Sequence, residues 1–160
     1  MKIYSFPPIA ATNSRIMLLG TMPSKDSLRL GQYYGNKRNA FWKIMFSLLN
    51  TAFSEDYDVR KSLLITNKIA VWDTLKACER ESSADADIIK PEPNDMQGFL
   101  EKHPSIEAVF CNGKDALAYV DKYFPALSLP AYYLPSSSAA NAIGWERKLS
   151  EWKVILEFLK

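Results

Sequence analysis

The sequence has few of the residues on which metal and cofactor sites are commonly built. Among 160 residues it has two cysteines, Cys78 and Cys111, and one histidine, His103. Two isolated thiols without a CxxC spacing exclude a four-cysteine zinc or iron–sulfur site. His103 precedes Pro104 at the expected end of a helix and has no ligand partner in sight, so we interpret it as structural. We therefore expect no metal ion.

Long hydrophobic runs are also missing. No apolar run approaches the roughly 20 residues that a membrane-spanning helix needs. The first residues carry one lysine, and Pro7–Pro8 interrupts the place where a signal peptide has its apolar core. Hydrophobic residues make up 48% and charged residues 24%, which is typical of a globular chain. With no internal repeat and no linker, we expect one domain over residues 1–160, cytoplasmic, reduced and monomeric.

Acidic residues are scarce in the first third of the chain. Between Met1 and Phe53 the only acid is Asp26, whereas the bases there are Lys2, Arg15, Lys25, Arg29, Lys37, Arg38 and Lys43. The balance reverses between Glu79 and Glu107. A basic region on a chain with a net charge of only +2 indicates a local anionic partner such as a phosphate backbone. The alternative is a solvated surface with unevenly distributed charge.

Buried strands alternate with amphipathic helices along the chain. The predicted strands are residues 15–20, 68–73, 106–111 and 131–134, and the predicted helices are residues 40–50, 57–65, 95–102, 114–123 and 145–159. A long loop is expected over residues 21–38, and residues 78–95 show no clear periodicity. This alternation predicts an α/β fold, a three-layer α/β/α sandwich around a central four-stranded parallel sheet.

Polar loops follow the predicted strands, at the edge where such folds bind ligands. "GTMPS" follows the first strand, "WDT" the second, "CNGK" the third and "LPSSSAAN" the fourth. Their small residues would let backbone N–H groups approach a ligand, and their hydroxyls would add hydrogen bonds. Proline and serine also make ordinary turns and helix caps. No GxxxxGK[ST] phosphate loop occurs.

Three of these segments together resemble the uracil-DNA glycosylase superfamily. "GTMPS", "GQYYGNKRNAFW" and "LPSSSAAN" occur in the order of its motifs, and the resemblance runs from about Arg15 to Asn141. It is strongest to the hypoxanthine-DNA glycosylase branch, followed by the mismatch-specific uracil glycosylases. The resemblance implies an enzyme that flips a deaminated base, hypoxanthine or uracil, out of DNA and hydrolyses its N-glycosidic bond without a cofactor.

The aromatic stretch at residues 31–42 would then serve the flipped base. Such a base needs a ring to replace its lost stacking, a contribution of about 1–3 kcal/mol. Aligned with "GFPFAHPANRFW"-like stretches of related glycosylases, Tyr34 takes the stacking position and Tyr33 lies beside it. Lys37 and Arg38 would hold flanking phosphates. Alternatively, the two tyrosines are core residues with exposed hydroxyls.

Two positions depart from the wider superfamily and shift the catalytic role. Many relatives have a polar residue where this chain has Met22, and a histidine or asparagine where it has Leu134. The hypoxanthine branch shares both absences, and its resemblance assigns catalysis to Asn39. An amide can orient water and stabilise a polar transition state. Asn39 also directly precedes a helix, where asparagine is a favoured N-cap.

The resemblance also implies a set of residues around the base. Asp73 ends the second strand and could accept a hydrogen bond from N1–H of hypoxanthine, although it could equally cap a turn. The other substrate-binding candidates are Gly20, Thr21, Met22, Pro23, Ser24, Tyr33, Tyr34, Ser136, Ser137, Ser138 and Asn141. Nothing marks Lys68 or Lys76 as desolvated, so we expect a monofunctional glycosylase.

Two other classes of function compete with this interpretation. One is a phosphate- or nucleotide-binding hydrolase that uses the "GTMPS" loop for an anion, but acidic metal-ligand clusters are missing near the strand ends. The other is a damaged-DNA-binding module with little or no activity, which Met22 and Leu134 make conceivable. Release of a base from a damaged oligonucleotide separates both from a glycosylase.

Overall fold

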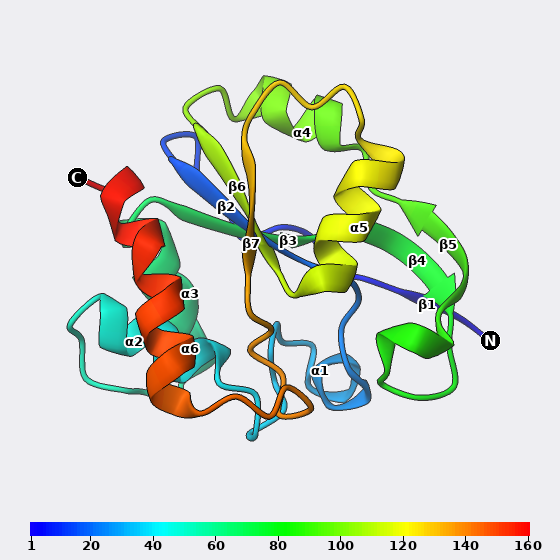
Figure 1. Cartoon of the computed structure of the whole chain (residues 1–160), viewed down its shortest axis with the longest axis horizontal. Helices are drawn as coiled ribbons and strands as arrows, with labels where there is room; N and C mark the ends of the chain where they lie inside the picture. The colour runs from blue at the N-terminus through cyan, green and yellow to red at the C-terminus, as the bar shows by residue number, and fades with distance from the viewer.

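The four predicted strands form one parallel sheet in the computed structural model, which describes residues 1–160. The strands are β2 (Ile16–Gly20), β3 (Ile69–Asp73), β6 (Ala108–Asn112) and β7 (Ala131–Leu134). Their order is β3-β2-β6-β7, and all three pairings are parallel. The sheet runs through the middle of the molecule with helices on both sides (Figure 1). The predicted fold class is therefore confirmed.

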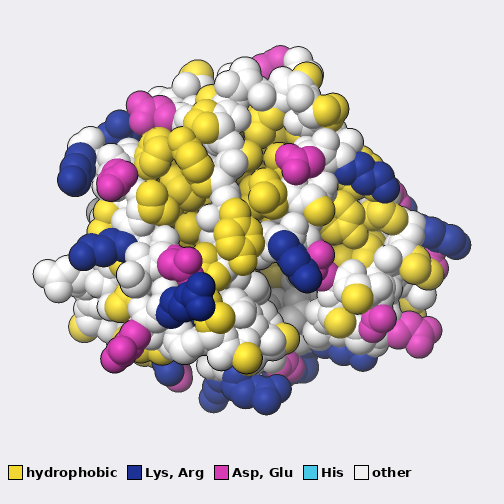
Figure 2. Space-filling view, in the orientation of Figure 1, with side chains coloured by type: hydrophobic (Ala, Val, Ile, Leu, Met, Phe, Trp, Pro, Cys, Tyr) yellow, Lys and Arg dark blue, Asp and Glu magenta, His cyan; other side chains and the backbone are white.

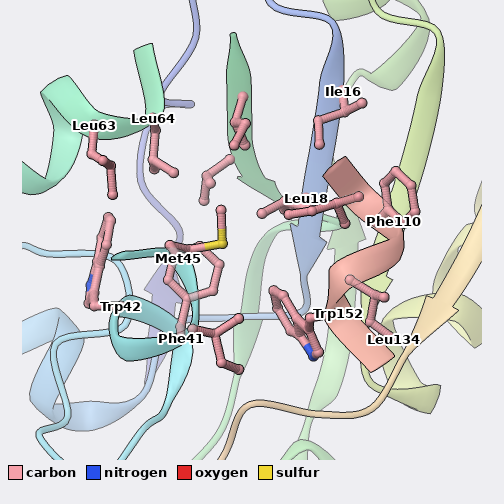
Figure 3. Close-up of a cluster of buried hydrophobic side chains, with 14 of the residues drawn as sticks. Ile16, Leu18, Phe41, Trp42, Met45, Leu63, Leu64, Phe110, Leu134 and Trp152 are labelled. Carbon is pink, nitrogen blue, oxygen red and sulfur yellow. The ribbon is translucent and has the colours of Figure 1, made fainter. Parts of the chain in front are cut away.

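One face of the sheet packs on three helices. Ile16 and Leu18 of β2 belong to a cluster that also contains Phe41, Trp42 and Met45 and extends to Trp152. Figure 3 shows these side chains meeting between the strands and the helices. The helices of this layer are α2 (Phe41–Leu48), α3 (Tyr57–Thr66) and α6 (Trp145–Trp152). This layer holds the largest buried side chains of the protein, so it is the main core.

The opposite face packs on two helices. Met17 and Leu19, which alternate with the inward residues of the first face, belong to a second cluster with Phe99 and Val120. These two come from α4 (Met96–Lys102) and α5 (Lys114–Tyr123). Successive strand residues point to opposite faces, so the continuous apolar run of β2 fills both cores.

Most helix boundaries lie within two residues of the predicted ranges. Asp56 caps α3 and Asp95 caps α4 through side-chain hydrogen bonds to backbone N–H groups. The last helix differs from the prediction, because α6 gives way to a 3-10 helix over Lys153–Phe158. No helix of the chain is both long and apolar enough to cross a membrane.

A second, antiparallel sheet lies where no regular structure was predicted. It has the order β1-β4-β5, with β1 (Lys2–Tyr4), β4 (Leu75–Glu79) and β5 (Ile89–Pro93). Between β4 and β5 a short 3-10 turn covers Asp85–Asp87. β5 is polar, exposed and rich in proline, and its partner pairs with the first residues of the chain. The pairing of β1 with β4 joins residues more than 70 positions apart, and β5 has no alternation of apolar and polar residues, so the local sequence pattern did not predict this sheet.

The predicted long loop after β2 contains a helix. α1 (Lys25–Leu30) begins after Ser24, whose Oγ accepts from the N–H of Ser27. It ends at Gly31, which has a φ of 67° in the left-handed region that favours glycine. Both ends carried recognisable cap residues, so this helix was within reach of sequence reasoning.

The strand order places a topological switch point between β2 and β6. From β2 the chain goes to β3 on one side and then returns to β6 on the other side of β2. Ligands of open α/β sheets bind at such a switch point, beyond the carboxyl ends of the strands. Gly20 and Asn112, the last residues of β2 and β6, flank this point. Figure 2 shows the surface hollowed beside the amino-terminal end of α5, which directly follows β6.

Candidate active site

Gly20, Tyr34 and Asp73 converge at the carboxyl ends of the strands. A Cβ atom on Gly20 would lie 2.7 Å from Oδ1 of Asp73 and 2.9 Å from the hydroxyl oxygen of Tyr34. Both distances are too short for any side chain, so the close approach requires a glycine. Three residues that the sequence proposed for substrate binding are therefore neighbours, although Gly20 and Asp73 are 53 positions apart in the chain.

Asp73 has one oxygen engaged and one free. The hydroxyl of Ser5 donates to Oδ2 at 2.6 Å, whereas no protein donor contacts Oδ1. The amide of Asn94 donates to the backbone carbonyl of Asp73 at 2.8 Å and holds the strand end in place. Burial raises the pKa of the Asp73 carboxyl to about 7, from an ordinary value of 3.8. The carboxyl therefore changes protonation near neutral pH.

Tyr34 is held flat against another ring. Its ring stacks on Phe41 with centroids 4.0 Å apart and planes 17° apart. Its backbone has a φ of 54°, a left-handed conformation that costs a bulky residue free energy and is often found at functional sites. The Tyr34 hydroxyl is buried without a hydrogen-bond partner, and burial together with the charge of Asp73 raises its pKa. Packing thus fixes the ring, while its hydroxyl makes no hydrogen bond.

Tyr33 points the other way, into the core. Only 3% of it is exposed, and its hydroxyl hydrogen-bonds the carbonyl oxygens of Phe6 and Pro7 at 3.0 Å each. Its carbonyl oxygen accepts from the indole N–H of Trp42. These contacts leave Tyr33 no surface for a base, so its role is to anchor the loop that carries Tyr34.

Asn112 is a site residue that sequence reasoning left out. Its Nδ2 donates to Oγ of Ser137 and its Oδ1 accepts from the N–H of Ser137, both at 2.9 Å. It also lies beside the Tyr34 hydroxyl, where its nearness works to lower the tyrosine pKa. Its position after a buried strand, within the quoted "CNGK", was the available signal. Asn112 clamps the serine-rich turn onto the end of β6.

The serine-rich turn after β7 is ordered by its own side chains. Ser136 Oγ accepts from the N–H of Ser138 at 3.1 Å, and Asn141 Nδ2 donates to the Ser136 carbonyl at 2.9 Å. Lys148 Nζ donates to the Ser138 carbonyl at 3.0 Å. Leu134 is 1% exposed and belongs to the main core. The serines and Asn141 thus shape the turn, and Leu134 anchors it.

The first loop is braced by the stretch that showed no periodicity. Thr21 Oγ1 donates to Oδ1 of Asp85 at 2.6 Å, and the Arg80 guanidinium donates to the Pro23 carbonyl. Burial raises the pKa of Asp85. Met22 packs in a small cluster with Leu75 and Cys78 and is 8% exposed. Met22, Pro23 and the cap residue Ser24 therefore shape the loop, and Met22 offers no polar group to water.

The amide oxygen of Asn39 has a structural partner, whereas the amide nitrogen has none. Its Oδ1 accepts from the N–H of Phe41 at 2.9 Å, at the start of α2, while Ala40 occupies the N-cap position without a side-chain hydrogen bond. Its Nδ2 donates to no protein group. The N–H of Ala40 donates to the Ser137 carbonyl at 2.9 Å. The Asn39 oxygen therefore accepts a hydrogen bond at the start of α2, while the two N–H donors of its amide have no partner. The side chain lies beside the serine-rich turn.

A cavity of about 480 Å³ adjoins Asn39, which we call the basic groove. Its lining residues are Lys37, Arg38, Asn39, Ala40, Lys43, Trp145 and Lys148. None of the four cationic side chains takes part in an ion pair. Figure 2 shows Lys and Arg side chains gathered along the lower rim, where Figure 1 draws the loop before α2. The predicted phosphate contacts Lys37 and Arg38 thus share one groove with Asn39.

The titratable side chains give no group of three or more that could hold a metal ion. Cys78 and Cys111 are both buried, and burial raises the pKa of the Cys111 thiol to about 12. Both behave as small apolar residues of the cores.

Comparison with known proteins assigns the chain to a family. The sequence profile of the Uracil DNA glycosylase superfamily matches residues 7–160. The chain belongs to this superfamily. It is thus a glycosylase by family, and the predicted resemblance is confirmed.

Individual relatives cover nearly the whole chain. A hypoxanthine DNA glycosylase of Methanosarcina acetivorans is 34% identical over 151 residues, which are 94% of this chain and 95% of the relative. A protein of the same name from Methanosarcina barkeri is also 34% identical, over 95% of this chain and 96% of its own. The solution NMR structure of a candidate uracil DNA glycosylase from Methanosarcina acetivorans superimposes with a TM-score of 0.87 at 32% identity, covering 99% of both chains.

Proposed function

We propose that this glycosylase removes hypoxanthine from DNA. The observation that carries the proposal is the buried carboxyl of Asp73, whose Oδ1 is free at the switch point of the sheet beside Gly20 and Tyr34. Two relatives of 34% identity that bear the name hypoxanthine DNA glycosylase support this choice of base.

The recognition step follows from the hydrogen-bonding edge of the base. Hypoxanthine carries an N1–H donor where adenine has an acceptor nitrogen. Ionised Asp73 Oδ1 accepts from this N–H, and adenine would instead face the carboxylate with a lone pair. Gly20 leaves room for the base edge, and the Tyr34 ring provides the stacking surface. The same contacts would also accept the N3–H of uracil, which makes uracil the second candidate base.

The hydrolytic step follows from the free donors of Asn39. The bond between C1′ of the sugar and the base nitrogen breaks, and its electron pair stays with the base. Water adds to C1′, and the proton that the water loses goes to the departing base. Negative charge develops on the departing base, and Asn39 Nδ2 donates a hydrogen bond to it. Because Oδ1 already accepts from the Phe41 N–H, the amide is presented with its nitrogen outward. Asn39 thus acts as an electrostatic stabiliser rather than as a base.

The opposing candidate is a module that binds damaged DNA without cleaving it. Met22 and Leu134 favour it, because both are apolar and packed where many relatives of the superfamily have polar groups. Under this candidate, affinity for a lesion would persist without release of any base.

A panel of oligonucleotides tests the proposal. Purified protein is incubated with duplexes and single strands carrying hypoxanthine, uracil, xanthine or a mismatched thymine, and strand scission at the abasic product is measured. We expect hypoxanthine release with weak or no uracil release. Robust uracil release without hypoxanthine release rejects the choice of base, and binding without any release favours the non-catalytic module.

A further inference from the structure

Trp145 is an aromatic side chain for which the packing of the protein gives no reason. It is 40% exposed, whereas the other three tryptophans, Trp42, Trp72 and Trp152, are at most 8% exposed. Its ring belongs to none of the hydrophobic clusters and pairs with no other aromatic ring. The indole N–H groups of Trp42 and Trp152 have carbonyl partners, but that of Trp145 has none. The ring therefore lies at the surface with part of its apolar area exposed and its donor without a partner.

The surroundings of Trp145 are those of a groove for a single nucleic-acid strand. It lines the basic groove with Lys37, Arg38, Lys43 and Lys148, and no acidic residue belongs to that lining. Grooves that hold one strand combine cationic side chains along the backbone with aromatic rings on which bases stack. Both components are present here within one cavity.

The serine-rich turn connects the basic groove to the strand ends where Gly20, Tyr34 and Asp73 converge. Lys148, one helical turn after Trp145, donates to the Ser138 carbonyl, while Ser137 is bonded to Asn112 and Ala40. The helix that begins at Trp145 is therefore linked through the turn to Ala40, next to Asn39, and to Asn112, which lies beside Tyr34. The turn itself carries only Ser, Ala and Asn from Ser136 to Asn141, so it offers no large ring of its own.

We infer that Trp145 stacks on the base next to the flipped nucleotide, on the strand whose phosphates follow the basic groove. This inference rests on the proposed DNA substrate and adds a second stacking surface to it. Tyr34 would then receive the flipped base and Trp145 its neighbour, with the backbone between them contacting Lys37, Arg38 and Lys43 of the groove. Stacking of an indole on a nucleobase quenches its fluorescence, and the other tryptophans are too buried to report it.

The test uses binding and does not depend on excision. Fluorescence and affinity are measured with an oligonucleotide containing a tetrahydrofuran abasic site, both single-stranded and in a duplex. We expect quenching on binding for the wild type and none for Trp145→Phe, which keeps a ring and most of the affinity. Trp145→Ala should weaken binding by about five-fold to about 150-fold, equivalent to 1–3 kcal/mol for one stacked base. Because no charge is removed, its salt dependence should equal that of the wild type.

Tyr4→Ala serves as a matched control, because Tyr4 is 55% exposed on β1 and lies outside the groove. Its affinity should be unchanged. If Trp145→Ala binds like the wild type, or if quenching persists in Trp145→Phe, the inference is overturned while the proposed function stands. If the stacking effects occur without release of any base, the inference stands and the proposed function fails. A wild type that binds neither oligonucleotide overturns both.

Discussion

The backbone N–H of Ala40 donates to the carbonyl oxygen of Ser137 at 2.9 Å. This bond joins the loop that carries Asn39 to the turn that follows β7, although the two residues are 97 positions apart in the chain. The same turn is clamped to β6 by Asn112. The amide of Asn39 is therefore positioned by contacts from both motifs, and its effects on stability and on catalysis have to be measured separately.

Replacement of Asn39 separates its role at the helix start from its proposed role in catalysis. Asn39→Ser keeps an acceptor for the helix-start N–H but loses the amide donors. Loss of a helix cap is worth about 1 kcal/mol and would lower the melting temperature of a domain of this size by about 2–4 °C. We expect the melting temperature of Asn39→Ser to fall by less than this. The single-turnover rate on hypoxanthine should fall by about 10²–10³, as for removal of one transition-state donor.

Asn39→Asp is the sharper companion variant. It has the same shape and is as good a cap, but it replaces the donors of Nδ2 by an acceptor. Thermal melting and single-turnover excision are compared for both variants. Near-normal excision by either one would mean that Asn39 serves only the helix.

Tyr34 should act through its ring. Tyr34→Phe removes a buried hydroxyl that has no partner, so we expect equal or higher stability and nearly full activity. Tyr34→Ala removes the ring that stacks on Phe41 and would stack on the flipped base. It should weaken catalysis by the equivalent of about 1–3 kcal/mol. The measurement is kcat/KM for excision. Equal impairment of both variants would show that the hydroxyl is the working group.

The raised pKa of Asp73 predicts a pH dependence of recognition. With a pKa of about 7, the carboxyl is protonated below neutral pH and ionised above it. Because the ionised form is the better acceptor for N1–H, excision should increase as the pH rises through about 7. Asp73→Asn should be slow and should lack this rise. Excision rates of the wild type and of Asp73→Asn, measured between pH 5.5 and 8.5, test this prediction. A rise that persists in Asp73→Asn excludes Asp73 as its source.

The same group predicts a change in stability. The folded-state pKa lies above the unfolded value, so the folded protein binds the Asp73 proton more tightly. The stability that this tighter proton binding contributes is fully present below about pH 4 and is lost as the pH rises to about 7. The wild type should therefore lose stability between pH 5 and pH 8, whereas Asp73→Asn should not. The melting temperature of Asp73→Asn should rise relative to that of the wild type over this range. A constant difference would contradict the raised pKa.

Lys37 and Arg38 should contact phosphates. Both line the basic groove and neither is in an ion pair. Lys37→Ala and Arg38→Ala should each flatten the slope of log affinity against log salt by about one. Lys61, which lies outside the groove on α3, provides the control for loss of a positive charge. Slopes that match the wild type would place the two side chains away from the strand.

Gly20 should tolerate no side chain. A Cβ atom there would come within 2.7 Å of Asp73 Oδ1 and 2.9 Å of the Tyr34 hydroxyl. Gly20→Ala should displace both groups and lower kcat/KM for hypoxanthine by at least ten-fold, the equivalent of about 1.4 kcal/mol. In the double variant Gly20→Ala with Tyr34→Phe, part of the loss should return because the hydroxyl no longer obstructs the methyl group. Full activity of Gly20→Ala would mean that this approach is unimportant for the base.

Local patterns in the sequence determined the main framework. The apolar runs of β2, β3, β6 and β7 predict buried strands, because a strand covered on both faces needs apolar residues at every position. The bounds of β7 and α5 match the prediction to the residue, since proline and glycine stop these elements at fixed points. The motif segments around Gly20, Asn39 and the serine-rich turn also identified the superfamily.

Only the tertiary structure decided how neighbouring side chains divide their roles. Tyr33 and Tyr34 are adjacent and chemically identical, yet a left-handed φ at Tyr34 sends one ring into the core and places the other beside Asp73. The antiparallel sheet and the bracing of Thr21 by Asp85 depend on partners far away in the chain. No local period encodes such contacts, because their free energy arises only once the main core has brought the partners together.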